Sequence, residues 1–193
     1  MCYDIIMTGF GGQGVQTISL IVAHAAMEKG LHVTYLPSYG VEKRGGRTNV
    51  YLIVSDDEIG SPITNTPQAL IALDAIGLSF FQKMLSQGSL LIANTSLTQE
   101  DAIAVQEGVR VLMVRFNEEA AALGNPKLAN MITLGCFLEE TALVSFEDVC
   151  SVMEEVIPER LHRTIPENVR AIDRGIAIAR ALRQTAAGRV SGS

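Results

Sequence analysis

Short apolar runs alternate along the chain with stretches in which apolar residues recur at helical spacing. The runs that predict strands cover residues 3–8, 32–36, 49–54, 69–73, 89–93 and 110–114. A short run that is apolar at almost every position is typical of a strand covered on both faces. The pattern therefore predicts an α/β protein with a mostly parallel sheet between helices.

The helices follow from the helical spacing of apolar residues. The spacing predicts helices over residues 15–29, 79–85, 99–106, 130–143 and 166–182. Gly30 stops the first of these helices, and the fourth is apolar around most of its circumference, which predicts that it is buried. Ser145 and Asp148 have the spacing of a capping box, which begins one more helix.

Length and composition indicate one domain with a partner. A chain of 193 residues is long enough for a large core, so we expect a single domain over residues 1–185 and a disordered tail over 186–193. Only 19% of the residues are charged, whereas soluble proteins average about 25%. This apolar character predicts a subunit interface, including a homodimer of the isolated chain. The net charge of -6 gives no support for nucleic-acid binding.

Two further features indicate a cytoplasmic protein. Cys2, Cys136 and Cys150 have neither zinc-ligand nor iron–sulfur spacing, so we interpret them as reduced structural residues. Residues 5–27 carry no Asp, Glu, Lys or Arg, but glycines and glutamines interrupt the run and no basic flank precedes it. We therefore expect a buried strand, turn and helix here, and neither a membrane span nor a signal peptide.

The first motif with chemical content is GFGGQGVQT, residues 9–17, where the first strand meets the first helix. Gly9, Gly11 and Gly14 fit the spacing G-x-G-x-x-G, which lets a backbone turn approach a phosphate at a helix N-terminus. Two interpretations remain open: a phosphate or other anion site, and a tight turn that packs the helix on the sheet. Gln13 has the same two alternatives, because its amide can face a ligand or cap the turn.

The second strand argues against a nicotinamide cofactor. The dinucleotide-binding fingerprint places an Asp or Glu about 20 residues beyond the glycines, at the end of that strand. The corresponding stretch, HVTYLPSYG, has no carboxylate before Glu42. A free-standing nucleotide-binding oxidoreductase therefore stays only as an alternative.

A second loop, rich in charge and glycine, follows the strand at 32–36. Because the loops after parallel strands gather at one edge of the sheet, we expect this loop close to the glycine loop. Its cations suit an anionic ligand or an acidic surface of another subunit, and a solvated charged loop is the alternative. The residues concerned are Tyr39, Gly40, Glu42, Lys43, Arg44, Gly45, Gly46 and Arg47.

No set of residues has the spacing of a catalytic or metal site. His24 falls on an apolar helix and is interpreted as a satisfied core or interface histidine, while His32 and His162 have no partner at a telling spacing. Asp74 either lies near a ligand at the sheet edge or caps the helix that follows it. Asn130 is predicted to be a helix cap.

Taken together, GFGGQGVQT, SYGVEKRGG with TNVYLIVSD, and NMITLGCFLEETALVS with VIPER resemble the gamma subunit of 2-oxoacid:ferredoxin oxidoreductases. The order and spacing of these motifs match from about residue 3 to about residue 175. The chain is most similar to the 2-oxoglutarate and branched-chain 2-oxoisovalerate types (the pyruvate/ketoisovalerate gamma domain), and less similar to the pyruvate and indolepyruvate types.

The resemblance implies a three-layer α/β/α sandwich with a mostly parallel, Rossmann-like sheet and C-terminal helices. It implies a cytoplasmic hetero-oligomer that oxidatively decarboxylates a 2-oxoacid such as 2-oxoglutarate or pyruvate, forms an acyl-coenzyme A and reduces ferredoxin. Thiamine diphosphate, Mg2+ and 4Fe–4S clusters are expected on the alpha, beta and ferredoxin-like delta partners. The gamma subunit is expected to hold no catalytic residue, and to contribute to coenzyme A binding and to assembly at the subunit boundary.

The family's two loops map onto matching positions of this chain. This chain has Val41 and Lys43 where the family more often has Pro and Met, so partner contacts and ligand preference there stay open. We hypothesise that Arg44 pairs with a carboxylate or phosphate at the boundary with the alpha subunit, because its planar guanidinium suits both. The mapped site residues are Gly9, Gly11, Gly12, Gln13 and Gly14 in the first loop, and Tyr39, Gly40, Glu42, Arg44, Gly45 and Gly46 in the second.

Three functions remain open at the level of sequence. The chain is a gamma subunit that helps to bind coenzyme A, a free-standing nucleotide-binding oxidoreductase, or a purely structural subunit whose two loops serve packing alone.

Overall fold

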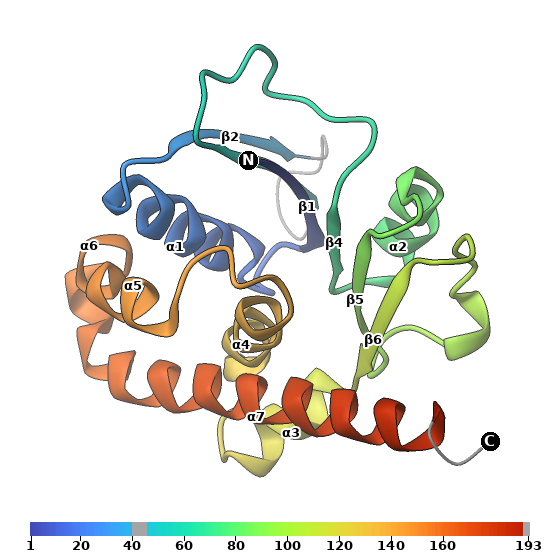
Figure 1. Ribbon diagram of the computed structural model, residues 1–193. Coiled ribbons are helices and arrows are strands. Elements are labelled where there is room, and N and C mark those ends of the chain that lie inside the picture. The colour runs from blue at the N-terminus through green and yellow to red at the C-terminus, as the bar shows by residue number, and fades with distance from the viewer. Residues whose placement is uncertain (40–45, 191–193) are drawn as a thin grey trace.

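A computed structural model describes residues 1–39 and 46–190, without the side chains of Tyr39 and of residues 186–190. Within these residues the chain forms one sheet of six strands in the order β2-β3-β1-β4-β5-β6 (Figure 1). The strands are β1 (Cys2–Phe10), β2 (His32–Tyr39), β3 (Arg47–Ser55), β4 (Ala69–Ala72), β5 (Leu90–Asn94) and β6 (Arg110–Val114). All six lie where the apolar runs predict strands, with ends that differ by a few residues.

The sheet is mostly parallel, as the sequence predicts, but β3 runs against both of its neighbours. The pairs β1–β4, β4–β5 and β5–β6 are parallel. A parallel crossover needs a connection of about a dozen residues or more, usually with a helix. The short connection between β2 and β3 cannot supply one, so these two strands pair as an antiparallel hairpin.

Helices cover both faces of the sheet unequally. Figure 1 shows α1 and α4 on one side of the strands and α2 on the other. The α-helices are α1 (Val15–Glu28), α2 (Ala75–Phe81), α3 (Phe116–Ala122), α4 (Ala129–Thr141), α5 (Phe146–Ser151), α6 (Met153–Val156) and α7 (Ile165–Val190). Short 3-10 turns are η1 (Gln82–Met84), η2 (Glu100–Ala102), η3 (Pro126–Leu128) and η4 (Glu159–Thr164).

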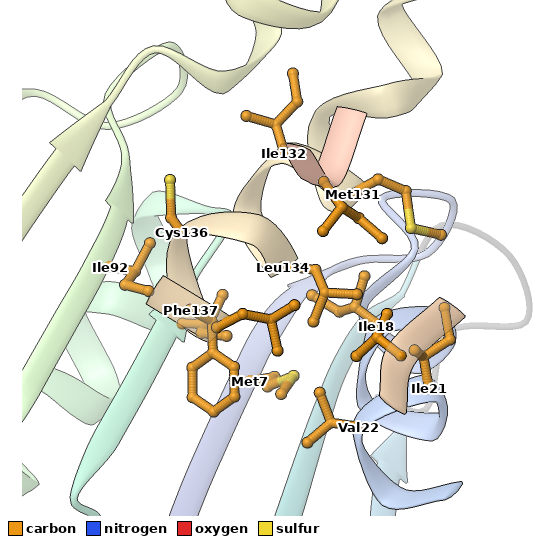
Figure 2. Close-up of a cluster of buried hydrophobic side chains, with 14 of the residues drawn as sticks. Met7, Ile18, Ile21, Val22, Ile92, Met131, Ile132, Leu134, Cys136 and Phe137 are labelled. Carbon is orange, nitrogen blue, oxygen red and sulfur yellow. The ribbon is translucent and has the colours of Figure 1, made fainter. Parts of the chain in front are cut away.

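The larger hydrophobic core lies between the sheet and the layer formed by α1 and α4. Figure 2 shows Met7 of β1 close to Val22 of α1 and Phe137 of α4. The residues of α4 from Asn130 to Leu138 are all buried, which confirms the predicted buried helix. Each large apolar side chain that is fully buried here stabilises the fold by about 1.5–3 kcal/mol.

Helix α4 crosses α7 at very short range through two glycines. A Cβ atom on Gly135 would lie 2.0 Å from the carbonyl oxygen of Ile172, and one on Gly175 would lie 2.0 Å from that of Ile132. The Cys136 thiol donates to the Gly175 carbonyl at 3.2 Å. Burial raises the pKa of Cys136 to about 12, so this thiol stays protonated and structural.

The predicted capping box is confirmed at the start of α5. The amide of Asp148 donates to the Ser145 hydroxyl at 3.1 Å, and the amide of Ser145 donates to the Asp148 carboxylate at 2.8 Å. The latter bond holds the pKa of Asp148 below its usual value. Lys29 at the end of α1 pairs with the same carboxylate at 3.1 Å, which ties α1 to α5.

The predicted helix at 99–106 is wrong, because only the turn η2 forms there. The side chain of Gln82 donates to the Ala102 carbonyl at 3.1 Å and accepts from the Ala104 amide at 2.9 Å. These two bonds satisfy backbone groups that a longer helix would otherwise satisfy, so the segment ends its turn at Ala102 and continues as extended backbone from Ile103. Ile103 and Val105 then pack against the smaller core under α2.

The predicted helix at 79–85 starts too late. Helix α2 begins at Ala75 because the carboxylate of Asp74 caps it, and η1 continues the turn as far as Met84.

Candidate functional site

The glycine loop lies where β1 ends and α1 begins, in the middle of the sheet. The chain leaves β1 for α1 on one face, and leaves the neighbouring β4 for α2 on the other. In open α/β sheets ligands bind at the carboxyl ends of strands, at the point where successive crossovers diverge in this way. The start of α4 lies beside the connection from β1 to α1, because Nδ2 of Asn130 is 3.5 Å from the Gly14 carbonyl.

Two residues of the loop need the backbone freedom of glycine. Gly12 has φ 97° and Gly14 has φ 77°, both in the left-handed region. Space is also short, since a Cβ atom on Gly14 would lie 2.1 Å from Nδ2 of Asn130. A Cβ atom on Gly9 would lie 2.7 Å from Oε1 of Gln13. The motif spacing thus reflects real constraints of the turn.

Gln13 joins the glycine loop to the end of β4. Its Oε1 accepts from the Phe10 amide at 2.6 Å, and its Nε2 donates to the Leu73 carbonyl at 3.1 Å. Both ends of the side-chain amide are therefore engaged within the chain. Gln13 had two possible roles, contact with a ligand and capping of the turn. The structure favours the capping role.

The N-terminus of α1 remains open beside this turn. Gly14 is its N-cap and supplies no side-chain oxygen, and the first turn holds no acidic residue. The first amides of a helix have no acceptor within the helix, and the helix dipole adds positive potential there. A hollow of about 310 Å³, which we call the helix hollow, adjoins these amides. It is lined by Phe10, Gly11, Gly12, Gly14, Val15, Gln16, Thr17 and Thr48.

The ends of the second loop lie beside the first, as its sequence position predicts. Phe10 pairs with Arg47 across the β1–β3 ladder, and Tyr39 pairs with Thr48 across the β2–β3 ladder. The Gly11 amide donates to the Gly46 carbonyl at 2.9 Å. Gly40, Glu42, Lys43, Arg44 and Gly45 lie outside the described residues, so their roles stay predictions.

Asp74 caps α2, which decides between its two alternatives. Its carboxylate accepts from the amides of Ile76 and Gly77 at 3.1 and 3.0 Å, and only 1% of the residue is exposed. Nε of Arg47 lies 3.8 Å from the same carboxylate, so the first residue of β3 is held at the sheet edge on the α2 side.

The other single residues have structural roles. Nδ1 of His24 lies 3.1 Å from Oε1 of Glu155, which confirms a satisfied histidine between α1 and α6. Nε2 of His162 lies 2.8 Å from the Ile157 carbonyl. The prediction that Asn130 is a helix cap is wrong, because Leu128 occupies the N-cap of α4. Asn130 instead points at the glycine loop, where its Nδ2 donates to the Gly14 carbonyl at 3.5 Å.

A second cavity, of about 250 Å³, opens on the β4 side of the glycine loop. We call it the amide cavity. Two of its residues, Asn94 and Asn117, are not among those that the sequence predicts for the site. Asn94 ends β5, so a polar residue directly after an apolar strand was the signal that could have found it. The lining residues are Gly12, Gln13, Leu73, Asn94, Asn117, Pro126, Lys127, Ala129 and Asn130.

Metal chemistry and membrane insertion find no support in the described ranges. No three His, Cys, Asp or Glu side chains gather there as metal ligands would. In the same part of the chain, no helix combines the length and the apolar character that a bilayer crossing requires.

Comparison with known proteins assigns the family. Residues 4–178 match the family described as pyruvate ferredoxin/flavodoxin oxidoreductase, so the chain belongs to this family. Within it the chain is of the gamma type. It is similar to the gamma subunit of a keto/oxoacid ferredoxin oxidoreductase from Geobacter sulfurreducens PCA, with 26% identity and a TM-score of 0.74. That match covers 93% of this chain and 99% of the other.

Two curated relatives differ in how much of them the chain covers. It is 32% identical to the 2-oxoglutarate synthase subunit KorC of Archaeoglobus fulgidus, over 92% of this chain and 88% of that protein. It is 33% identical to the ketoisovalerate oxidoreductase subunit VorA of Methanothermobacter thermautotrophicus, over 68% of this chain. The chain spans only 27% of that longer relative.

One larger assembly shares the fold alone. A 2-oxoglutarate:ferredoxin oxidoreductase from Magnetococcus marinus, with 2-oxoglutarate, coenzyme A and succinyl-CoA bound, superposes with a TM-score of 0.84 at 19% identity. The match covers 93% of this chain and 31% of that one.

Proposed function

We propose that this chain is the gamma subunit of a 2-oxoacid:ferredoxin oxidoreductase complex, in which it helps to bind coenzyme A and to hold the subunits together. The complex oxidatively decarboxylates a 2-oxoacid such as 2-oxoglutarate, transfers the acyl group to coenzyme A and passes two electrons to ferredoxin. Partner subunits carry the thiamine diphosphate, Mg2+ and 4Fe–4S clusters. We also infer a Rossmann-like, three-layer arrangement, with α2 and η1 as the thinner outer layer.

The open N-terminus of α1 carries this proposal. Coenzyme A is a phosphate-rich anion, and the helix hollow adjoins first-turn amides that have no acceptor within the helix, at a positive helix end. Such a site stabilises an anionic group by about 0.3–1 kcal/mol, and by up to about 2 kcal/mol where it is partly buried. The sequence adds Lys43 and Arg44 in the neighbouring loop.

The geometry also bears on the alternative of a purely structural subunit. The side-chain amide of Gln13 makes both of its hydrogen bonds within the chain, as a packing role requires. These bonds do not involve the first-turn amides of α1, so a rigid turn and an anion site are compatible.

The substitution Gln16→Glu tests the anion site. Gln16 lines the helix hollow in the first turn of α1, and glutamate has the same shape but adds a negative charge. We expect the KM of the assembled complex for coenzyme A to rise about tenfold, because the carboxylate repels phosphate. The helix itself should gain about 0.3–1 kcal/mol from an acidic residue at its N-terminus, so the loss of affinity would not come from unfolding.

The matched control is Gln106→Glu, the same change on an exposed loop residue. It should leave the KM for coenzyme A unchanged. An unchanged KM in Gln16→Glu as well would show that the helix hollow does not contact coenzyme A, and the structural role would then be preferred.

A further inference from the structure

The amide cavity lies next to the helix hollow and shares Gly12 with it. Five segments meet around the cavity: the glycine loop, the end of β4, the end of β5, the start of α3, and η3 with the start of α4. At about 250 Å³ it is smaller than the pockets of about 300–1,000 Å³ that hold whole drug-sized ligands. Its size suits one planar group of a larger ligand.

A chain of hydrogen bonds orients Asn117 so that its donor is free. Oδ1 of Asn94 accepts from the Ser96 amide at 3.2 Å, which directs Nδ2 of Asn94 toward Oδ1 of Asn117, also at 3.2 Å. The acceptor of the Asn117 amide is thereby used. Its Nδ2 has no hydrogen-bond partner among residues 1–39 and 46–190. Asn94 is 2% exposed, so this support is fixed by burial.

Asn130 supplies the opposite group on the other side of the cavity. Its Nδ2 faces the Gly14 carbonyl at 3.5 Å, which leaves Oδ1 as the free end of the amide. In the part of the chain that the structure describes, no donor reaches this oxygen. The residue is 8% exposed. Asn117 and Asn130 thus bring one unused donor and one unused acceptor to the lining of the cavity.

The remaining walls are apolar or cationic. Leu73, Pro126 and Ala129 give the cavity flat apolar contact area, while Lys127 is exposed at its edge. No carboxylate in the described residues pairs with Lys127. An uncharged planar group joined to an anion would match this lining. Its faces would contact the apolar residues, its polar edge would contact the asparagines, and the anion would lie near Lys127.

We propose that the amide cavity binds a planar group carrying an N–H donor beside an acceptor, with Asn117 donating to it and Asn130 accepting from it. The inference rests on the proposed function, in which the ligand is coenzyme A. Coenzyme A offers this chemistry twice, in the amides of its pantetheine arm and in its adenine ring. Its phosphates then occupy the neighbouring helix hollow, and Lys127 stands near the junction of the two sites.

Titrations of the full chain with three probes test this proposal. The probes are coenzyme A, pantetheine, and adenosine 3′,5′-bisphosphate, and the readouts are the dissociation constant and the NMR signals of the asparagine side-chain amides. We expect coenzyme A and one of the two fragments to shift the Asn117 and Asn130 signals. The fragment that does so identifies which part of coenzyme A enters the cavity.

Asn117→Asp is the decisive variant. It keeps the shape of the side chain and the acceptor for Asn94, but replaces the free donor by a second oxygen. The change lies in the first turn of α3, where a negative charge does not weaken the helix. We expect the dissociation constant for coenzyme A to rise about tenfold, the size expected when one partner of a hydrogen bond is left unpaired. Asn65→Asp, on an exposed loop, is the control and should change nothing.

The outcomes separate the two proposals. In one outcome the chain binds coenzyme A tightly, Asn117→Asp does not change the affinity, and the asparagine signals do not shift. This outcome would overturn the cavity site and keep the coenzyme A role. A fragment that shifts these signals while coenzyme A fails to bind would keep the cavity site and overturn the coenzyme A role. Failure of all three probes would overturn both.

Discussion

Single residues of the glycine loop are constrained both by their backbone conformation and by contacts with neighbouring side chains. Gly14 has a left-handed backbone and also has no room for a Cβ atom beside Asn130. Gln13 has both ends of its amide engaged, at Phe10 and at Leu73. A loop held in this way keeps its backbone in one geometry, which lowers the entropy lost when a ligand binds.

The clearest prediction at this scale concerns Gly135, where α4 meets α7. An alanine inside a helix normally stabilises it by up to about 1 kcal/mol relative to glycine. Here the new Cβ would lie 2.0 Å from the Ile172 carbonyl oxygen, so the helices must move apart. We expect Gly135→Ala to lower the free energy of unfolding by about 1–3 kcal/mol or more, as overpacking of a core does. Urea denaturation measures it.

Gly60→Ala is the matched control for that change. No heavy atom lies within 4 Å of the position that its Cβ would take, and its backbone is not left-handed. This variant should stay within about 0.5 kcal/mol of the parent chain, as most surface substitutions do. A Gly135→Ala protein as stable as the Gly60→Ala protein would mean that α4 and α7 are not packed at this distance.

At the scale of elements, side chains decide where several helices and turns begin or fail to form. Asp74 starts α2, and the Ser145–Asp148 box starts α5. Gln82 has the opposite effect, because its amide bonds the Ala102 carbonyl and the Ala104 amide, and no helix continues beyond η2. The segment after β5 thus covers the thin side of the sheet as a strap and not as a helix.

Gln82→Met should release this strap. Methionine fills a similar volume but leaves the Ala102 carbonyl and the Ala104 amide without their partners. We expect a loss of about 1–3 kcal/mol in the free energy of unfolding, the cost of buried polar groups without partners. Hydrogen exchange should become faster over residues 100–105 and stay unchanged in α4.

The control for this element is Gln184→Met, an exposed position on α7. It should leave both stability and exchange as they are. Unchanged exchange over residues 100–105 in Gln82→Met would show that the apolar contacts of Ile103 and Val105 suffice to hold the strap.

At the scale of the whole molecule, the chain has features of a subunit that works with partners. Ile76 and Phe80 on α2 are 52% and 67% exposed, on the face of the sheet with the thinner cover. A chain with two hollows at the glycine loop and exposed apolar side chains fits the proposed place at a subunit boundary.

We predict that the protein is part of a larger complex in its host. Anaerobic purification of the tagged chain should recover partner subunits that carry thiamine diphosphate and iron–sulfur clusters. The recovered assembly should reduce a dye in the presence of a 2-oxoacid only when coenzyme A is added, and a series of 2-oxoacids should identify the substrate. A chain that purifies alone and binds a nicotinamide nucleotide would instead support the free-standing oxidoreductase.

Local patterns in the sequence by themselves determined the strands, most of the helices and the two loops. An apolar run identifies a strand that is covered on both faces, because every residue of such a strand is buried, whichever face its side chain points to. The capping box at Ser145 is equally local, since it depends on contacts within a few residues, and the left-handed backbone at Gly12 and Gly14 is a local demand of the turn. That locality is why these features could be predicted from the order of residues alone.

Only the tertiary structure decided the features that join distant segments. Three features depend on a partner from another part of the chain: the antiparallel direction of β3, the bonds of Gln82 to residues 102 and 104, and the direction of the Asn130 side chain. The amide cavity does so most of all, because its asparagines come from β5, α3 and α4 and meet only after the sheet has formed. The end of an apolar strand is a local signal for Asn94, but no spacing in the sequence places Asn117 and Asn130 beside it, since that geometry is set by packing between elements.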